Sequence, residues 1–131
     1  MIKRILVIED NPGSLRLMGY TLEKKGYQVI TASDGLEGLR KAQDEHPNLI
    51  ILDVMLPGLD GYEVCHRLRQ KPETAILPIL IISAKAHQDD KDIAFRVGAD
   101  DYLTKPVAPS AMVAKVEALL NGTSQIVYGE S

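Results

Sequence analysis

The sequence has little cysteine, no long apolar run and no secretion signal, and each absence excludes a class of protein. Cys65 is the only cysteine among 131 residues, which excludes a disulfide framework and a thiolate metal site. No apolar run approaches the roughly 18–20 residues that a membrane-spanning helix needs. The first residues, Met-Ile-Lys-Arg, lead straight into a short apolar run without a small-residue cleavage site, which argues against a signal peptide. We therefore expect a cytoplasmic protein with no membrane partner.

The sequence also lacks an excess of basic residues over acidic ones. The chain has 15 lysines and arginines against 18 aspartates and glutamates, for a net charge of -3, and its basic residues are scattered. This balance argues against nucleic-acid binding through a basic surface of this segment. No internal repeat or low-complexity segment is visible, so at this length we expect one domain. We place that domain at residues 1–122 and interpret residues 123–131 as a polar tail or the start of a linker.

The central feature of the chain is an apolar run that ends in a carboxylate. Residues 49–52, Leu-Ile-Ile-Leu, are uninterrupted and Asp53 follows at once. Such a run, with prolines on both sides, is typical of a strand buried on both faces of a parallel sheet. Similar runs occupy residues 5–8 and 78–82, a more polar run at 28–32 suits a sheet edge, and a short run lies at 101–103.

Helical spacing of apolar residues predicts a helix after each of these five runs. Ser33 or Asp34 can cap the second helix, on which we expect Leu36, Leu39 and Ala42 to face inward. The predicted helices lie at about residues 14–25, 34–46, 60–69, 88–97 and 109–121. Strands that alternate with helices imply an α/β fold, in which helices cover both faces of a five-stranded parallel sheet through right-handed crossovers.

Four of the predicted strand ends carry polar side chains that can meet. Parallel strands place their carboxyl ends at one edge of the sheet, where open α/β folds bind ligands. The side chains at these ends are Glu9, Asp10, Asp53, Ser83 and Lys105. Three carboxylates within a few ångströms would repel one another and raise at least one pKa, unless a cation lies among them. Hard oxygen ligands without sulfur or converging histidines favour Mg²⁺ over zinc, and Asp10, Asp53 and a backbone carbonyl would be sufficient protein ligands.

The charges of this predicted site suit a phosphoryl group. Three carboxylates, one magnesium ion and Lys105 sum to about zero when fully ionised. The metal, the ammonium and the hydroxyl of Ser83 could each take one phosphoryl oxygen. Asp53 is the best nucleophile of the set, because carboxylates form aspartyl phosphates in proteins.

These residues, in this order and at these spacings, resemble the receiver domain of two-component response regulators from residue 3 to about residue 120. Single-domain receivers of the chemotaxis and cell-cycle types are similar. The motifs that carry the resemblance are Glu9-Asp10, Leu52-Asp53 followed by Met55, Pro57-Gly58 and Asp60-Gly61, Ser83-Ala84, the Gly-Ala-Asp-Asp-Tyr run at 98–102, and Lys105-Pro106. The resemblance implies a flavodoxin-like fold with strand order 2-1-3-4-5.

The resemblance also implies the roles of the site residues. Asp53 would accept a phosphoryl group from a histidine kinase or a histidine phosphotransfer protein, and Ser83 and Lys105 would bind its oxygens. Glu9, Asp10, Asp53 and the backbone carbonyl of Met55 would hold Mg²⁺, with Glu9 acting through water. The protein would catalyse nothing beyond its own phosphorylation and dephosphorylation.

A change of surface would follow phosphorylation, again by resemblance. Tyr102 would be the aromatic switch, turning inward when Ser83 moves to the phosphoryl group. The face made by helix 88–97, strand 101–103 and helix 109–121 would then control a downstream partner or a linked output domain. Phe95 and Lys91 would lie on that face with Tyr102. Lys105-Pro106 resembles the cis peptide of the family.

Three other functions compete with this interpretation. A phosphatase of the haloacid dehalogenase class also has an aspartate nucleophile, but its nucleophile follows the first strand and a general acid stands two residues on, where this chain has Met55. A flavodoxin-like flavin carrier would need a hydroxyl- and glycine-rich loop after the first strand, and Glu9-Asp10 would repel a phosphate there. The intact acidic set disfavours a degenerate receiver that is never phosphorylated.

Several residues also suit ordinary structural roles. By residue type alone, Tyr102 is as well suited to packing as to switching. Cys65 is expected to be a small apolar core residue. The three histidines, His46, His66 and His87, are far apart in the pattern and are expected on the surface.

Overall fold

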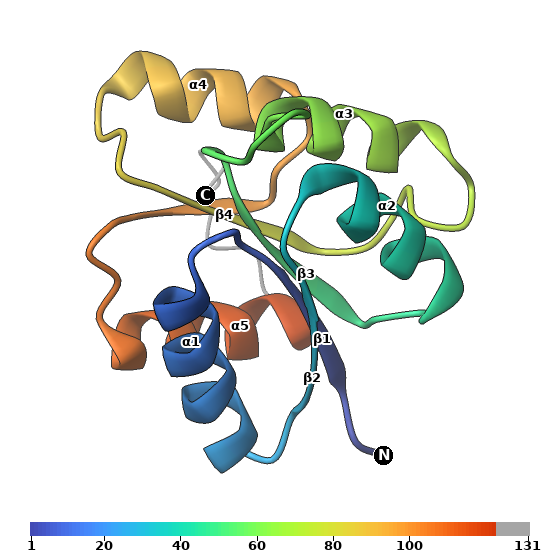
Figure 1. Cartoon of the computed structure of the whole chain (residues 1–131), viewed down its shortest axis with the longest axis vertical. Coiled ribbons are helices and arrows are strands. Elements are labelled where there is room, and N and C mark those ends of the chain that lie inside the picture. Colours follow the sequence, from blue (N-terminus) through green and yellow to red (C-terminus); the bar gives the residue numbers. More distant parts are fainter. Residues whose placement is uncertain (123–131) are drawn as a thin grey trace.

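The chain forms a five-stranded parallel sheet between two layers of helices (Figure 1). The computed structural model describes residues 1–122, so the predicted tail at 123–131 lies outside the described residues. The strands are β1 (Arg4–Ile8), β2 (Gln28–Ala32), β3 (Leu49–Asp53), β4 (Ile79–Ser83) and β5 (Asp101–Thr104). The helices are α1 (Pro12–Lys24), α2 (Gly35–Asp44), α3 (Gly61–Gln70), α4 (Gln88–Arg96) and α5 (Pro109–Leu120).

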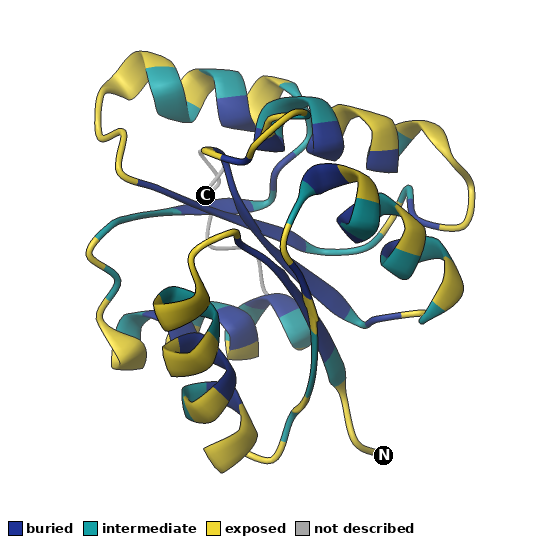
Figure 2. Cartoon of the chain, viewed as in Figure 1, coloured by how far each residue is buried: buried dark blue, intermediate teal, exposed yellow. Residues whose placement is uncertain are grey.

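The strand order is β2-β1-β3-β4-β5, as the resemblance implied. The polar strand β2 lies at one edge, and every neighbouring pair is parallel. All five residues of β3 and all five of β4 are buried, so the sheet centre is dark blue in Figure 2. Burial on both faces explains why these strands are continuous apolar runs rather than alternating ones.

The core has two halves, one on each face of the sheet. Leu6 and Ile8 of β1 face the half covered by α2, α3 and α4, in the upper part of Figure 1. Ile5 and Val7 face the half covered by α1 and α5, in the lower part. Each such side chain that leaves water contributes about 1.5–3 kcal/mol. This burial holds the strand ends, and the side chains that follow them, in fixed positions.

Side-chain caps decide where the first two helices begin. Asn11 caps α1, its Oδ1 accepting from the N–H of Ser14 at 2.9 Å, so the helix begins at Pro12, two residues before the predicted start. Proline suits the first turn of a helix because no N–H is needed there. Asp34, rather than Ser33, caps α2 by accepting from the N–H of Glu37 at 2.8 Å.

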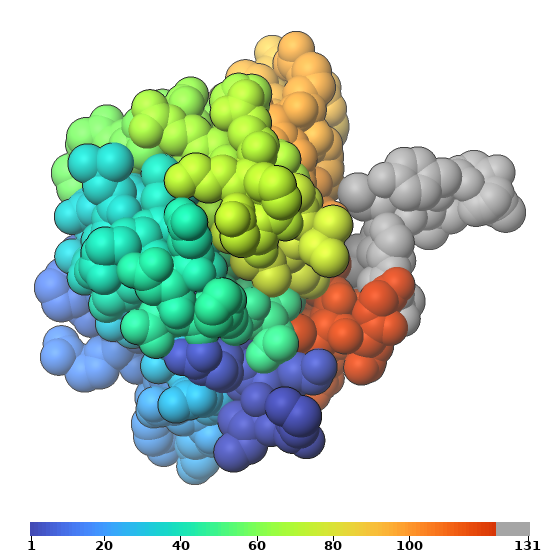
Figure 3. Space-filling view, turned by 90° about the vertical axis from the view of Figure 1, so that its right-hand side faces the viewer, coloured from blue at the N-terminus to red at the C-terminus, as the bar shows by residue number. Residues whose placement is uncertain are grey.

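The prediction that Leu36 faces the core is wrong. Leu36 is 66% exposed, while Gly35 and Gly38 face inward and Ala42 is buried as predicted. A Cβ at Gly38 would lie 2.5 Å from the Cδ1 atom of Ile8, so α2 approaches the sheet too closely for a larger residue. Apolar periodicity selects large side chains, and it therefore missed a helix that packs through glycine. The outer surfaces of α2 and α3 lie side by side in Figure 3.

Cys65 and the three histidines are placed as predicted. Cys65 is fully buried, and His46, His66 and His87 are all exposed. Among residues 1–122, no helix is long and apolar enough to cross a membrane.

Candidate functional site

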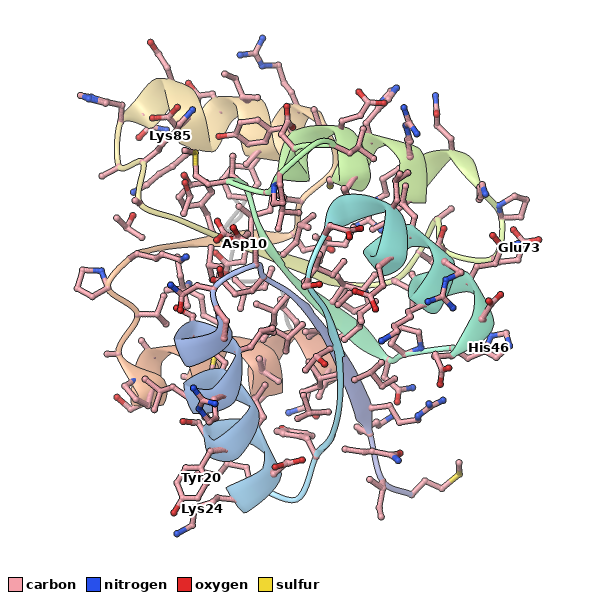
Figure 4. The ribbon with its side chains drawn as sticks, in the orientation of Figure 1. Asp10, Tyr20, Lys24, His46, Glu73 and Lys85 are labelled. Atoms are coloured by element: carbon pink, nitrogen blue, oxygen red, sulfur yellow. The ribbon has the colours of Figure 1, made fainter. Side chains whose placement is uncertain are left out.

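The five predicted polar residues follow the carboxyl ends of four strands. Glu9 and Asp10 come directly after β1, Asp53 and Ser83 are the last residues of β3 and β4, and Lys105 follows β5. Because the strands are parallel and adjacent, these ends meet at one edge of the sheet. Figure 4 shows Asp10 at this edge, on the loop between β1 and α1.

Three carboxylates converge there. Glu9, Asp10 and Asp53 each offer an oxygen, and these oxygens all lie within 4.8 Å of one another. Glu9 and Asp53 are only 1% and 2% exposed, whereas Asp10 is exposed. Two carboxylates are therefore held out of water, and the third opens the cluster to solvent.

Lys105 lies between the two buried carboxylates. Its Nζ is 2.9 Å from Oε1 of Glu9 and 2.8 Å from Oδ2 of Asp53. Burial alone would lower the pKa of Lys105, but the hydrogen bonds to Asp53 and Glu9 outweigh that effect and raise the pKa. Burial raises the pKa of Glu9, although Lys105 and the N–H of Asn11 favour its charged form. The ammonium is thus kept charged, while burial continues to oppose the charge on Glu9.

The donor set fits a divalent cation. Three carboxylates and one ammonium leave a formal charge of -2, and all the candidate ligands are hard oxygens, as Mg²⁺ prefers. The other oxygen of Asp53, Oδ1, accepts from the N–H of Met55 at 3.0 Å, so the loop after β3 folds back on the carboxylate. The side chain of Met55 itself is 58% exposed.

Ser83 and Tyr102 are linked through the backbone of Lys85. Ser83 is fully buried, and its Oγ accepts from the N–H of Lys85 at 3.0 Å. The hydroxyl of Tyr102 donates to the carbonyl of Lys85 at 2.7 Å. Tyr102 is only 7% exposed and faces inward in this structure, and its role as the aromatic switch stays a prediction. The carbonyl of Lys85 provides the acceptor that a buried phenol needs.

The strand ends are also tied together directly. The N–H of Lys105 donates to the carbonyl of Ser83 at 2.7 Å, and the Lys105-Pro106 peptide is cis, as the resemblance implied. The hydrogen bond places Lys105, directly after β5, beside Ser83 at the end of β4.

Sequence reasoning missed two residues near this edge. Lys85 connects Ser83 to Tyr102 through backbone atoms that every residue has, so no residue type could have indicated it. Asn11 caps α1 and also donates its N–H to Oε2 of Glu9 at 3.0 Å. An asparagine before a proline is a recognisable helix-cap signal, and it would have placed Asn11 next to the site.

An apolar cavity lies beside the carboxylates. It has a volume of about 510 Å³ and is lined by Glu9 and Lys105 on the site's side and by Leu17, Met18 and Val107 among its apolar walls. The cavity therefore extends from the site to α1 and the loop that precedes α5.

Comparison with known proteins gives the family. Residues 5–117 match the response regulator receiver domain. The chain is 52% identical over 120 residues to the alkaline phosphatase synthesis transcriptional regulatory protein PhoP of Bacillus subtilis. This match covers 92% of this chain and 49% of that protein. It is 46% identical over 123 residues to the DNA-binding dual master transcriptional regulator RpaA of Synechocystis, covering 94% of this chain and 51% of the relative. The chain thus spans about half the length of these curated relatives.

Solved structures of receivers have the same fold. A putative response regulator from Chloroflexus aurantiacus superposes with a TM-score of 0.89 at 36% identity, covering 92% of this chain and 99% of that one. The receiver domain of the sensor histidine kinase PA1611 from Pseudomonas aeruginosa has a TM-score of 0.85 at 29% identity, over 92% and 99% of the two chains, and holds a magnesium ion in its active site cleft. The phosphatase and flavin-carrier alternatives are not favoured by these matches. The chain belongs to the receiver domains of two-component response regulators.

Proposed function

We propose that Asp53 is the phosphoacceptor of this receiver and that its phosphoryl group comes from a histidine kinase or a histidine phosphotransfer protein. One observation supports this most strongly. The buried carboxylate of Asp53 has one oxygen on the ammonium of Lys105 and the other on the N–H of Met55, within a cluster of three carboxylates. A carboxylate oriented in this way can attack phosphorus. Glu9 has similar contacts, to Lys105 and to the N–H of Asn11, but Asp53 is the one carboxylate of the cluster that lies within a strand.

The proposed transfer is a displacement at phosphorus. An oxygen of Asp53 forms the new P–O bond while the P–N bond of the donor phosphohistidine breaks, and the imidazole leaves with the bonding electrons. Lys105 places its positive charge beside that oxygen. The Oγ of Ser83 accepts from the N–H of Lys85, so its hydroxyl hydrogen is available to a phosphoryl oxygen. When bound, Mg²⁺ supplies further positive charge to the same oxygens. Glu9, Asp10, Asp53 and the carbonyl of Met55 would hold it.

The product should be a lasting signal rather than a step in turnover. Hydrolysis of an acyl phosphate is assisted by a nearby proton donor, and Met55 has none to offer two residues after Asp53. We therefore propose that the domain catalyses only its own phosphorylation and dephosphorylation. The signal would pass to the face made by α4, β5 and α5.

The partner that delivers the phosphoryl group must reach Asp53 from the open side of the site. We propose that it docks on α1 next to the apolar cavity, where Leu17 and Tyr20 are 57% and 59% exposed. Exposed apolar side chains beside a reactive group are typical of protein interaction surfaces.

The wider setting is proposed from the relatives. Both curated relatives are named as transcriptional regulators and are about twice as long as the match, so we propose that this receiver controls an output domain or partner that acts on transcription in the cytoplasm. Residues 1–122 would be the receiver, and 123–131 a tail or the start of a linker.

Phosphorylation by a small donor tests the proposal. Acetyl phosphate with magnesium should label wild-type protein at one alkali-labile position, and peptide mass spectrometry should place the label on Asp53. Asp53→Asn should abolish the label, whereas Asp44→Asn, at the exposed end of α2, should retain it. Label that persists in Asp53→Asn would point to another acceptor, with Ser83 first, and a wild-type protein that takes no label would be a degenerate receiver.

A further inference from the structure

The first half of α4 is weakly attached to the rest of the domain. Residues 84–89 are all exposed, and the N-cap residue His87 makes no side-chain hydrogen bond to the helix. Ala94, in the second half, is the buried residue of this helix. Tertiary packing normally supplies most of a helix's stability, so this half depends on other contacts.

The carboxyl end of α4 is anchored firmly to α3. Arg69 of α3 donates from Nε to the carbonyl of Gly98 at 2.9 Å, and its Nη2 pairs with Asp100 at 2.8 Å. Its Nη1 donates to the carbonyl of Leu77 at 2.6 Å, just before β4. The Sγ of Cys65 also donates to the carbonyl of Val97 at 3.4 Å. Hydrogen bonds from a charged guanidinium are stronger than neutral ones, so this end of α4 is fixed to α3 and β4.

The amino end of α4 is held by two tyrosine hydroxyls. Tyr62, in the first turn of α3, donates to the carbonyl of Asp90 at 3.2 Å. Tyr102 donates to the carbonyl of Lys85 in the loop that leads into α4. Burial, together with Tyr102 and Asp90, raises the pKa of Tyr62 to about 12, so its phenol remains a donor at neutral pH. These are single neutral bonds, unlike the contacts of Arg69.

Tyr62 is itself held close to the phosphoacceptor strand. The N–H of Gly61 donates to the carbonyl of Val54 at 2.9 Å, and a Cβ at Gly61 would lie 2.3 Å from the carbonyl oxygen of Asp53. The start of α3 therefore lies directly on the end of β3. Tyr62 thus spans the distance between the strand that carries Asp53 and the first turn of α4.

We propose that Tyr62 is a latch for α4. The hydrogen bond from its hydroxyl to Asp90 holds the amino end of α4 against α3, and α4 pivots about its anchored end at Val97–Gly98 when this bond opens. Gly98 has a φ of +110°, a conformation that other residues rarely adopt, at the point where the pivot lies.

The trigger of the latch rests on the proposed function. When the side chain of Ser83 turns toward a phosphoryl group on Asp53, its Oγ moves away from the N–H of Lys85. The freed peptide of Lys85 belongs to the exposed loop before α4, so its movement pulls on the first turn of the helix. The latch itself exists without phosphate and can be tested without it.

Amide hydrogen exchange without any phosphodonor tests the latch. Tyr62→Phe removes only the hydroxyl, and Tyr27→Phe, at a half-buried position directly before the edge strand β2, is the matched control. The amides of Asp90 and Lys91, which donate to the carbonyl of His87, should exchange roughly two- to ten-fold faster in Tyr62→Phe, as expected for the loss of one net hydrogen bond. The amides of Val97 and Ala99 should be unchanged. Unchanged exchange at Asp90 and Lys91, or equal acceleration at both ends of the helix, would overturn the proposal.

A second arm adds magnesium and beryllofluoride, which imitates an aspartyl phosphate. In wild type, exchange at Asp90 and Lys91 should rise while Val97 stays protected, and in Tyr62→Phe the further rise should be small. An increase in amide exchange that is as large at Val97 as at Asp90 would overturn the proposed pivot. If magnesium and beryllofluoride changed no amide exchange near Asp53, the proposed function would be overturned. The first arm, without beryllofluoride, would still decide whether Tyr62 is a latch.

Discussion

The ammonium of Lys105 lies within 3 Å of two carboxylates that water scarcely reaches. A buried carboxylate without a partner is costly, and a cation between two of them lowers their mutual repulsion. Asp10 lacks such burial and faces the open side of the cluster. The three carboxylates should therefore respond differently to substitution.

Asp10→Asn should weaken magnesium binding on the order of ten-fold or more, because it removes one negative charge from a set of hard oxygen ligands. Calorimetry or NMR shifts can measure the affinity, since the chain has no tryptophan for fluorescence. Asp44→Asn removes the same charge far from the cluster and should leave the affinity unchanged. Equal affinities in wild type and Asp10→Asn would remove Asp10 from the metal site.

Glu9→Gln should change how stability depends on pH. Burial raises the pKa of Glu9 above 4.5, so the folded protein binds this proton more tightly than the unfolded chain does. Without magnesium, the unfolding free energy should therefore fall as pH rises from about 4.5 through the folded pKa and level off above it. Urea denaturation should show a smaller fall in Glu9→Gln, while Glu73→Gln, on an exposed loop, should follow wild type. Identical slopes in both variants would contradict the burial of a charged Glu9.

At the scale of elements, α2 shows that a helix can be fitted to a sheet by its smallest residues. Gly35 faces the loop after β3 and Gly38 faces Ile8 of β1, while Leu36 faces water. α1 contains a contrasting case, because a Cβ at Gly19 would find its nearest neighbour, Val29 Cγ1, at 3.8 Å, an ordinary contact distance. The same substitution should therefore have opposite effects in the two helices.

Gly38→Ala should destabilise the domain by about 1–3 kcal/mol, because overpacking against Ile8 exceeds the gain in helix propensity. Gly19→Ala should instead stabilise it by up to about 1 kcal/mol. Chemical denaturation measures both. Ile8→Val removes the Cδ1 atom that the new Cβ would meet, so the double variant Gly38→Ala with Ile8→Val should lose less than the sum of the two single changes. An additive result would show that α2 simply moves away.

At the scale of the whole molecule, phosphorylation changes the charge at one edge of the sheet, and the structural response must reach α4 and β5. The phosphoryl group turns the single charge of Asp53 into about two. Lys105 touches Asp53 through its ammonium and Ser83 through its backbone, while Ser83 and Tyr102 share Lys85. The path from the site to the α4–β5–α5 face is therefore a short series of hydrogen bonds.

Lys105→Met should separate phosphorylation from its consequence. Asp53 should still take label from acetyl phosphate, because the nucleophile remains, but the NMR shifts of Tyr102 and the first turn of α4 should respond much less. The phosphoryl oxygens would lack their cationic partner, so they would bias the two states less strongly. Lys24→Met, on the exposed surface of α1, should behave like wild type. Full shifts at Tyr102 in Lys105→Met would exclude this path.

Much of the architecture is readable from residue order, because the period of apolar residues identifies element type and burial on both faces leaves a continuous apolar run. Residues 49–52 followed by Asp53 thus indicated a central strand with a carboxylate at its end. The equivalence of parallel strand ends was then enough to bring Glu9, Ser83 and Lys105 to the same edge.

Other features depended on distances between elements that are far apart in the chain. Lys105 forms an ion pair with Glu9, 96 residues away in the chain, whereas the sequence indicated only a role in binding a phosphoryl group. Tyr102 and Tyr62 find their acceptors on backbone carbonyls, which carry no mark in the sequence. The inward face of α2 was decided by how closely it approaches Ile8, a separation that periodicity along one helix does not contain. Local pattern selects the elements, and only their packing selects the partners of each polar side chain.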